Sequence, residues 1–333
     1  MDLELGEEQA ALVDVVASIA DRSSSPAAVR AHEELGFSAE LWRRLGEAGL
    51  PGIALPEREG GGGAGLLELA LAVEVLGAHV APAPLVEHAV TARLLARAAG
   101  PPPGHVVDGT TIATLALRPP IDGVARLLPA GAVAATFVAR RGDDLIQVTS
   151  DAPGAAVANL ASAPLAHRRI DPATVVASGP TARALHDRAV AEWQALTAAL
   201  LAGLGAGVLE LARTYVVDRH QFGRPIGSFQ AVQHTLADVT VALDGAQLLA
   251  RKAAWALDRD RDDALDLAAM AFLFAAEQAQ HAAERALHFH GGYGFMQEYD
   301  VQLYYRRAKG WPLVLGAPVR EYQRLAASRY GAA

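Results

Sequence analysis

The chain of 333 residues contains no cysteine, which excludes disulfide bonds, thiolate catalysis and cysteine-ligated zinc. It also has no excess of positive charge: the net charge of -8 argues against non-specific binding to nucleic acid. Its alanine-rich runs are interrupted by charged or amide residues before about 18 residues have passed, so we expect no membrane-spanning helix. The acidic N-terminus does not have the pattern of a signal peptide, and we expect a cytoplasmic protein.

The composition that remains is that of a globular protein, with 52% apolar and 20% charged residues. The length suffices for two or three hydrophobic cores. We predict an α+β fold that is mostly helical, with an N-terminal helical domain at 1–103, a reduced β domain at 104–180 and a C-terminal helix bundle at 181–333.

The middle segment differs from its neighbours because Gly, Pro and Asp separate short runs with high β propensity. These runs predict strands at Thr111–Leu117, Ala132–Ala139, Leu145–Thr149 and Thr174–Ser178. We therefore expect a small antiparallel β domain. The last segment has long apolar-periodic runs at about 182–218, 228–257 and 262–289, followed by a short helical pair from 298, which indicates a bundle.

The stretch from Arg219 to Gln233 is unusual, because two glycines, a proline and a serine lie between Phe222 and Phe229. This composition predicts a helix, a tight turn and a second helix. Gln230 and Gln233 lie three residues apart and share one helix face. An Arg and two Gln beside such a turn can bind an anionic group such as a pyrophosphate, although a solvated helical hairpin has the same pattern.

A second glycine-rich stretch follows the third long helix, with glycines at 291, 292 and 294. Glycines there allow the backbone to approach a ligand closely, or simply end the helix. His288 and His290 lie two residues apart and do not share a helix face. No further ligands accompany them, so we predict no metal site.

Three sets of residues together resemble the acyl-CoA dehydrogenase family. The first is Arg-x-x-Phe-Gly followed by Phe-Gln-x-x-Gln, from Arg219 onward. The second is His-Gly-Gly-Tyr-Gly-Phe followed by Tyr-Arg-x-Ala, between His290 and Ala308. The third is Phe-Ser-x-Glu-Leu-Trp-x-x-Leu-Gly, from Phe37.

This resemblance implies an FAD enzyme that removes an α proton and a β hydride from an acyl-CoA thioester. In that family the hairpin and the second glycine stretch hold the FAD of a neighbouring subunit. The residues that the resemblance assigns to cofactor binding are Arg219, Phe222, Gln230, His288, Gly291 and Gly292. The family usually has Gln at the position of His288, and histidine can also donate a hydrogen bond.

The catalytic carboxylate that the resemblance calls for is missing. The two positions that hold it in different family members are Leu315 and Trp193 here, and neither side chain accepts a proton. Glu192 is a weak candidate, because one residue along a helix is a rotation of about 100°. We expect Glu192 to be a solvated charge. The flavin-ring loop typical of the family is also absent from the segment that begins at Ala113.

The resemblance is closest to the base-lacking subunit of bacterial heteromeric acyl-CoA dehydrogenases, which act on bulky esters such as steroid side chains. It implies a related partner subunit, a dimer of dimers, an acyl-CoA substrate and an electron-transfer flavoprotein as electron acceptor. Two alternatives remain open. One is a self-sufficient homotetramer with a displaced carboxylate, and the other is a non-catalytic scaffold or acyl-CoA-binding relative.

Overall fold

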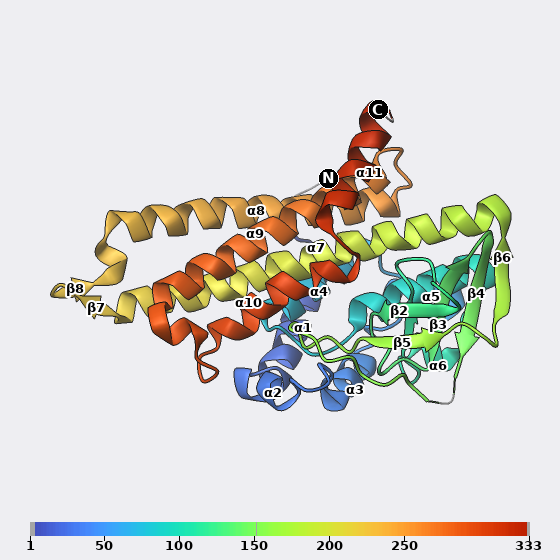
Figure 1. Ribbon diagram of the computed structural model, residues 1–333, viewed down its shortest axis with the longest axis horizontal. Helices are drawn as coiled ribbons and strands as arrows, with labels where there is room; N and C mark the ends of the chain where they lie inside the picture. Colours follow the sequence, from blue (N-terminus) through green and yellow to red (C-terminus); the bar gives the residue numbers. More distant parts are fainter. Residues whose placement is uncertain (1–3, 151, 332–333) are drawn as a thin grey trace.

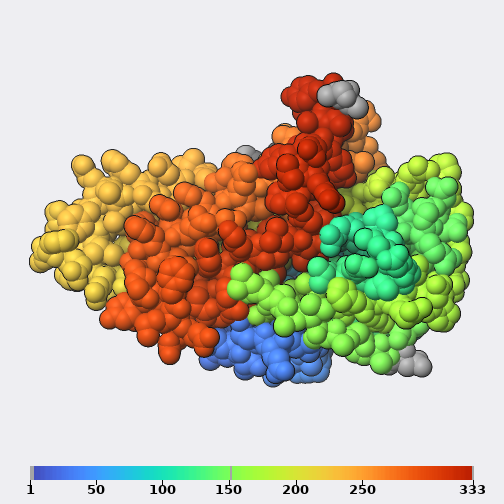
Figure 2. Space-filling model, in the orientation of Figure 1, coloured from blue at the N-terminus to red at the C-terminus, as the bar shows by residue number. Residues whose placement is uncertain are grey.

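The computed structural model describes residues 4–150 and 152–331, so the outermost residues of the first and last predicted domains lie outside it. Figure 1 shows an elongated, mostly helical molecule with the strands of the middle β region gathered at one end of its long axis. The predicted fold class is confirmed. A helical hairpin forms the opposite end, and Figure 2 shows this yellow hairpin projecting beyond the orange C-terminal helices.

The N-terminal segment is helical throughout. Its elements are α1 (Glu7–Ser23), α2 (Pro26–Ala31), α3 (Ala39–Glu47), η1 (Glu57–Glu59), α4 (Leu66–Ala78), α5 (Leu85–Ala99) and α6 (Gly104–Val107). Serine side chains begin two of these helices: Ser25 Oγ accepts from the Ala28 N–H, and Ser38 Oγ from the Leu41 N–H. Such caps satisfy N–H groups that have no partner within the helix.

The β region is mixed, and the prediction of a purely antiparallel domain is wrong. Its strands are β1 (Ala113–Leu115), β2 (Val124–Leu128), β3 (Thr136–Arg141), β4 (Asp144–Thr149), β5 (Ala166–Arg169) and β6 (Thr174–Ser178). One sheet has the order β1-β3-β4-β6, with β1 and β3 parallel, while β2 and β5 form a separate antiparallel pair. The chain between β1 and β3 contains β2, and this long crossover permits the parallel pairing.

The C-terminal segment contains the three long helices that the sequence predicts. Its elements are α7 (Gly179–Asp218), β7 (His220–Gln221), β8 (Arg224–Pro225), η2 (Ile226–Ser228), α8 (Gln230–Asp258), α9 (Ala264–His290), η3 (Gly291–Phe295), α10 (Val301–Gly310), η4 (Pro312–Val314) and α11 (Pro318–Tyr330). Helices α8 and α9 both pack on α7, as Figure 1 shows.

Helix α7 is the centre of the molecule. One continuous hydrophobic cluster joins it to α1, α4, α5, α8, α9 and α10, and also reaches β-region residues such as Val138 and Leu145. By length and composition α7 could cross a membrane, since its most apolar window has a mean hydropathy of 1.8. However, 67% of that window is buried inside the fold, as expected for the core helix of a bundle.

Glycines allow α4 and α7 to pack with their backbones almost in contact. A Cβ atom at Gly77 would lie 2.0 Å from the Leu200 carbonyl oxygen, and one at Gly203 would lie 1.9 Å from the Glu74 carbonyl oxygen. Gly207, one turn further along α7, comes equally close to the backbone of α4. No larger residue fits at these positions unless the two helices separate.

Replacing Gly203 by alanine should therefore lower the free energy of unfolding by about 1–3 kcal/mol, the typical cost of overpacking a core. A matched control is Gly245→Ala in α8, where the new methyl group would meet Phe274 at an ordinary 3.5 Å. The control should be neutral or slightly stabilising, because alanine favours helix more than glycine does. Urea unfolding followed by circular dichroism measures both changes, and equal stability of the two variants would contradict this packing.

Candidate functional site

The hairpin between α7 and α8 presents its side chains outward. Helix α7 ends where Arg219 adopts an extended backbone conformation, and the chain turns through Phe222 and Gly223, both with positive φ. A positive φ is unfavourable for a bulky residue such as phenylalanine. This backbone conformation directs the Phe222 side chain into solvent. Phe222 is 91% exposed.

The other predicted cofactor-binding residues of this hairpin are also exposed. Gln230 is the first residue of α8, and both it and Arg219 lie on the surface. Among the described residues the Arg219 guanidinium forms no ion pair, whereas Arg213 on the same helix is paired with Glu210. Within residues 4–150 and 152–331, the hairpin thus carries a cation without a carboxylate partner and an exposed amide.

The second glycine stretch turns at the end of α9. Gly291 has a φ of 58°, and a Cβ atom at Gly291 or Gly292 would meet nothing within 4 Å. These two glycines are therefore not required by internal packing, and the space beside them is open. His288 is exposed on the last turn of α9.

His290 has a structural role instead. It is buried, stacks on the Tyr215 ring with 4.0 Å between the centroids, and shares a hydrogen bond with the Ala286 carbonyl. Burial lowers its pKa, which favours a neutral ring. No group of His, Asp or Glu residues suited to a metal ion occurs in the described ranges.

The two motifs meet along one groove. The Arg219 guanidinium lies 5.9 Å from the centre of the Tyr293 ring, which belongs to the turn that begins at Gly291. Both side chains line an open groove of about 860 Å³ that continues past Tyr215 and Tyr304. The sequence separates these motifs by about 70 residues, and the fold brings them to the same end of the bundle (Figure 1).

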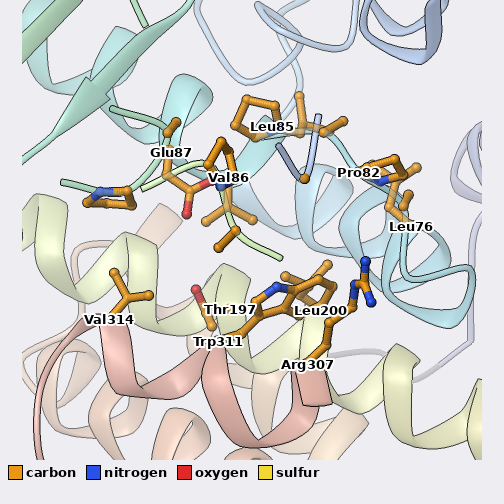
Figure 3. Close-up of a pocket in the computed structure, with 18 of the residues that line it drawn as sticks. Leu76, Pro82, Leu85, Val86, Glu87, Thr197, Leu200, Arg307, Trp311 and Val314 are labelled. Carbon is orange, nitrogen blue, oxygen red and sulfur yellow. The ribbon is translucent and has the colours of Figure 1, made fainter. Parts of the chain in front are cut away.

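The usual base positions lie at or beside a different site, a cavity lined by residues of α5, α7 and η4 such as Glu87, Thr197 and Val314 (Figure 3). Trp193 and Val314, the neighbour of Leu315, line an apolar cavity of about 80 Å³ there. Leu315 itself is buried. From Thr197 in this cavity to Arg219 is 22 residues of continuous helix, or about 33 Å at 1.5 Å per residue. The hairpin is therefore too far away to serve this cavity.

A carboxyl group that the sequence analysis missed faces this cavity. Glu87 of α5 lines it, and the indole Nε1 of Trp193 donates to Glu87 Oε1 over 3.1 Å. Burial raises the pKa of this carboxyl because the charged form loses its water. No specific signal in the sequence marked it, because Glu87 is one of several polar residues between Leu85 and Leu95.

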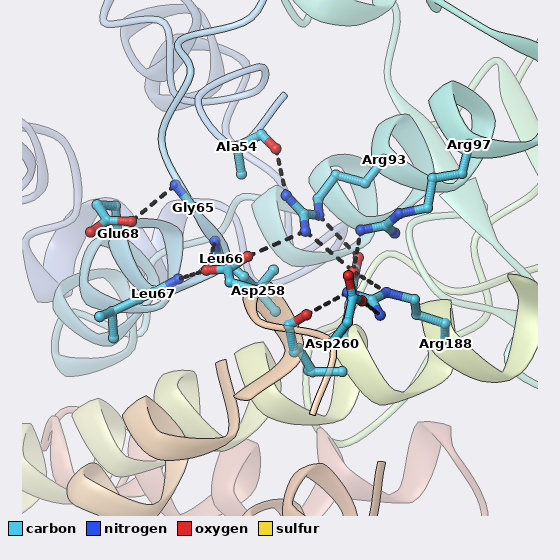
Figure 4. Close-up of polar contacts among 12 residues, drawn as sticks. Ala54, Gly65, Leu66, Leu67, Glu68, Arg93, Arg97, Arg188, Asp258 and Asp260 are labelled. Carbon is cyan, nitrogen blue, oxygen red and sulfur yellow. Dashed lines mark hydrogen bonds and ion pairs between the residues drawn. The ribbon is translucent and has the colours of Figure 1, made fainter. Parts of the chain in front are cut away.

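Glu192 is not a solvated charge, and that expectation is wrong. Its side chain is fully buried and accepts hydrogen bonds from Arg93, Arg97 and Arg188, which come from two different helices (Figure 4). Burial by itself would raise the pKa of Glu192, but Arg93 and Arg97 lower this pKa to about 2. A carboxylate held in this way is a structural ion pair and a poor base.

The segment after β1, where the family has its flavin-ring loop, offers few hydrogen-bond donors. It contains Leu117, Arg118, Pro119 and Pro120, so it has no side-chain hydroxyl and two residues without a backbone N–H. Arg118 lies beside the loop at Gly316, where a Cβ would be 3.9 Å from its Nη1 atom. These residues do not fit a flavin ring that needs donors from this loop.

The chain was compared with known proteins. The model of the acyl-CoA dehydrogenase N-terminal domain matches residues 6–100, and that of the C-terminal domain matches residues 187–328. Acyl-CoA dehydrogenase IpdE2 of Mycolicibacterium smegmatis is 32% identical over 97% of this chain and 99% of the relative. The chain belongs to the acyl-CoA dehydrogenase family.

Solved structures agree with this assignment. A variant of the Tcur3481-Tcur3483 steroid ACAD superposes with a TM-score of 0.86 at 30% identity, covering 97% of this chain and 98% of the other. The ChsE4-ChsE5 complex from Mycobacterium tuberculosis gives a TM-score of 0.88 at 29% identity over the full length of both chains. Family membership supports an oxidoreductase that acts on acyl-CoA, and it implies FAD as the cofactor.

The buried ion pairs of Glu192 with Arg93 and Arg97 should stabilise the folded protein. Glu192→Gln should lower the free energy of unfolding by about 3–5 kcal/mol at neutral pH, because it leaves buried arginines without their partner. Since the folded-state pKa is lowered to about 2 from 4.5, the stabilisation is complete above pH 4.5 and is lost as pH falls toward 2.

The measurement is urea unfolding of wild type and variant across that pH range. The stability difference between them should shrink as the pH falls below 4.5. Glu210→Gln is the matched control, since Glu210 forms an exposed ion pair on the same helix and its loss should cost less than about 1 kcal/mol. If Glu192→Gln lowers the free energy of unfolding equally at low and neutral pH, the negative charge of Glu192 is not what stabilises the protein.

Proposed function

We propose that this chain is a subunit of a heteromeric FAD-dependent acyl-CoA dehydrogenase. It lacks its own catalytic base and completes the FAD site of a partner subunit. The single observation that carries this proposal is the position of the cofactor-binding residues. They lie exposed at one end of α7, about 33 Å along the helix from the cavity that is lined by Trp193, one of the two usual base positions.

The exposed groups fit the phosphates and adenine of FAD. Arg219 offers a guanidinium with no carboxylate partner in the described part of the chain, Gln230 offers an amide, and His288 offers a ring nitrogen. Gly291 and Gly292 leave open space for close approach, and Phe222 presents an uncovered aromatic face. When bound, FAD would accept the hydride of the acyl-CoA, while these residues bind and orient it.

The partner subunit would supply the catalytic carboxylate and the contacts to the flavin ring. Leu315 and Trp193 replace the carboxylate at both usual positions, and Glu192 is locked among arginines. The segment at Leu117–Pro120 has no side-chain hydroxyl, and two of its residues have no backbone N–H for a flavin ring. The structural similarity to the ChsE4-ChsE5 complex supports a related second subunit.

The proposal also covers the assembly, the electron acceptor, the location and the substrate. We expect an α2β2 dimer of dimers in the cytoplasm that passes electrons to an electron-transfer flavoprotein. Its substrate would be a bulky acyl-CoA from fatty acid or steroid side-chain degradation. The similarity to a steroid ACAD supports the substrate class. The acidic net charge fits a protein that does not bind nucleic acid.

The self-sufficient alternative would need another carboxylate base. Glu87 is the carboxyl group nearest to this role, because it lines the same cavity and hydrogen-bonds Trp193. Burial raises its pKa, a shift that general bases also show, so the pKa does not decide between the two alternatives. The absence of a carboxylate from both usual positions, Trp193 and Leu315, favours the heteromer over the homotetramer.

Flavin content tests the proposal directly. The chain expressed alone should be colourless, and co-expression with the acyl-CoA dehydrogenase encoded next to it should give a yellow complex that oxidises acyl-CoA. The measurements are flavin absorbance and dye reduction with a panel of acyl-CoA esters. Yellow, active protein from this chain alone would refute the heteromer. If co-expression yields no complex and no flavin, that result would support the alternative of a non-catalytic scaffold.

Arg219→Ala should weaken FAD binding in the complex by about tenfold or more, because it removes a charged hydrogen-bond donor to phosphate. Arg213→Ala is the matched control: this arginine is exposed on the same helix but is paired with Glu210, so its loss should leave FAD affinity unchanged. Fluorescence titration of the apo-complex with FAD measures both affinities. Equal affinities in the two variants would remove Arg219 from the cofactor site.

A further inference from the structure

A polar pocket of about 420 Å³ lies between α5 and the segment 54–64, which contains η1 and a glycine-rich loop. It shares no lining residue with the cavity beside Trp193 or with the groove at Arg219. Pockets that bind small molecules have volumes of roughly 300–1,000 Å³. This pocket is therefore large enough for a small ligand, and it is separate from the sites described above.

Backbone packing holds the loop wall of this pocket in place. The Gly63 N–H donates to the Leu55 carbonyl over 2.9 Å, and a Cβ atom at Gly61 would lie 2.4 Å from the same carbonyl oxygen. The Arg93 guanidinium of α5 donates to the Ala54 carbonyl over 2.5 Å and ties the helix to this wall (Figure 4). The pocket is thus formed before a ligand arrives, which lowers the cost of binding.

Arg97 of α5 brings a guanidinium with unused donors to the pocket. Its Nη2 atom donates to Glu192 over 2.7 Å, and this is the one side-chain hydrogen bond that Arg97 makes within residues 4–150 and 152–331. About a third of the side chain is exposed. An arginine has five N–H donors in a planar fork that matches a carboxylate, so several donors remain for a ligand.

Glu59 of η1 brings a carboxylate that lacks a firm partner. Its Oε1 atom lies 3.4 Å from Nη2 of Arg58, a side chain that is 80% exposed. Its Oε2 atom is buried and has no hydrogen-bond partner in the part of the chain that the structure describes. The last torsion of a glutamate is broad, so the carboxylate can turn toward a donor in the pocket. Such a donor would remove the cost of the unsatisfied oxygen.

The charges around the pocket favour a ligand that carries both signs. Arg93 is already paired with Glu192 and Asp258, so Arg97 is the arginine of α5 with donors to spare. An anion would be attracted by Arg97 and repelled by Glu59, and an amine would meet the reverse. A zwitterion satisfies both groups at once.

The rest of the lining limits the body of the ligand. It is formed mainly by small or apolar residues, which are Ala54, Leu55, Pro56, Gly63, Ala64 and Ala96. These walls offer no further side-chain hydrogen bonds. They suit an aliphatic ligand.

We propose that this pocket binds a small aliphatic amino acid as its zwitterion. Its carboxylate accepts hydrogen bonds from Arg97, and its ammonium group donates to Glu59. α-Amino acids and ω-amino acids share this chemistry and differ in the separation of the two charges.

This binding requires neither FAD nor a partner subunit, so it is independent of the proposed function. Loss of flavin from the complex would leave the pocket intact. Loss of amino-acid binding would leave the hairpin at Arg219 intact.

The first experiment compares ligands with two charges and with one. Isothermal titration calorimetry at pH 7 on the full-length chain gives affinities for L-leucine, its isomer 6-aminohexanoate, hexanoate and hexylamine. One of the two zwitterions should bind about tenfold or more tightly than both hexanoate and hexylamine, because each of these lacks one charged hydrogen bond. The tighter zwitterion identifies the separation of charges that the pocket accepts.

Glu59→Gln tests the carboxylate. It should weaken the tighter zwitterion by about tenfold and leave hexanoate unchanged or tighter, because a repulsive charge is removed. Glu57→Gln is the matched control: it makes the same charge change in the same η1 turn, but Glu57 is exposed and does not line the pocket. Its affinities should equal those of wild type.

Arg97→Gln tests the cation. It should weaken the zwitterion and hexanoate by about tenfold while hexylamine binds as well as before or better. Arg97 also pairs with Glu192, so circular dichroism must first show that the variant folds. If it does not fold, the comparison of Glu59→Gln with Glu57→Gln decides the question.

Three results would overturn the proposal. The first is no saturable binding of either zwitterion to wild type. The second is a zwitterion affinity no higher than that of hexanoate or hexylamine. The third is equal zwitterion affinity in Glu59→Gln and Glu57→Gln.

Discussion

The length of one unbroken helix fixes the distance between the two sites of this protein. Helix α7 runs for 40 residues, or about 60 Å, from the β region to the hairpin. Because α4, α5, α8 and α9 all pack on it, it cannot shorten or bend without disrupting the core. The cavity and the hairpin that carries Arg219 are therefore held about 33 Å apart along the helix.

Helix α7 is apolar because other helices pack closely around it in the bundle. Gly77 and Gly203 bring α4 and α7 into backbone contact, which leaves no room for lipid or water between them. Polar anchors complement this apolar packing. Arg93 of α5 and Arg188 of α7 bind Glu192, and Arg93 also pairs with Asp258 at the end of α8 (Figure 4).

Local patterns in the sequence predicted the parts of the fold that depend on neighbours along the chain. The long C-terminal helices and the turn after Arg219 follow from apolar periodicity, glycine and proline. Long-range partners were not predictable in the same way. The pairing of β2 with β5, the parallel contact of β1 with β3, and the arginines around Glu192 all join residues far apart in sequence. Glu87 was missed for the same reason, since only the fold places it beside Trp193.

Glu87 and Glu192 show how the same side chain acquires opposite properties. Both are enclosed by protein near the N-terminal half of α7, and burial alone would raise the pKa of each. Arg93 and Arg97 reverse this effect at Glu192, whereas Glu87 receives neutral N–H groups and no cation. Glu192 therefore remains charged and serves stability. Glu87 has no arginine partner, and burial raises its pKa.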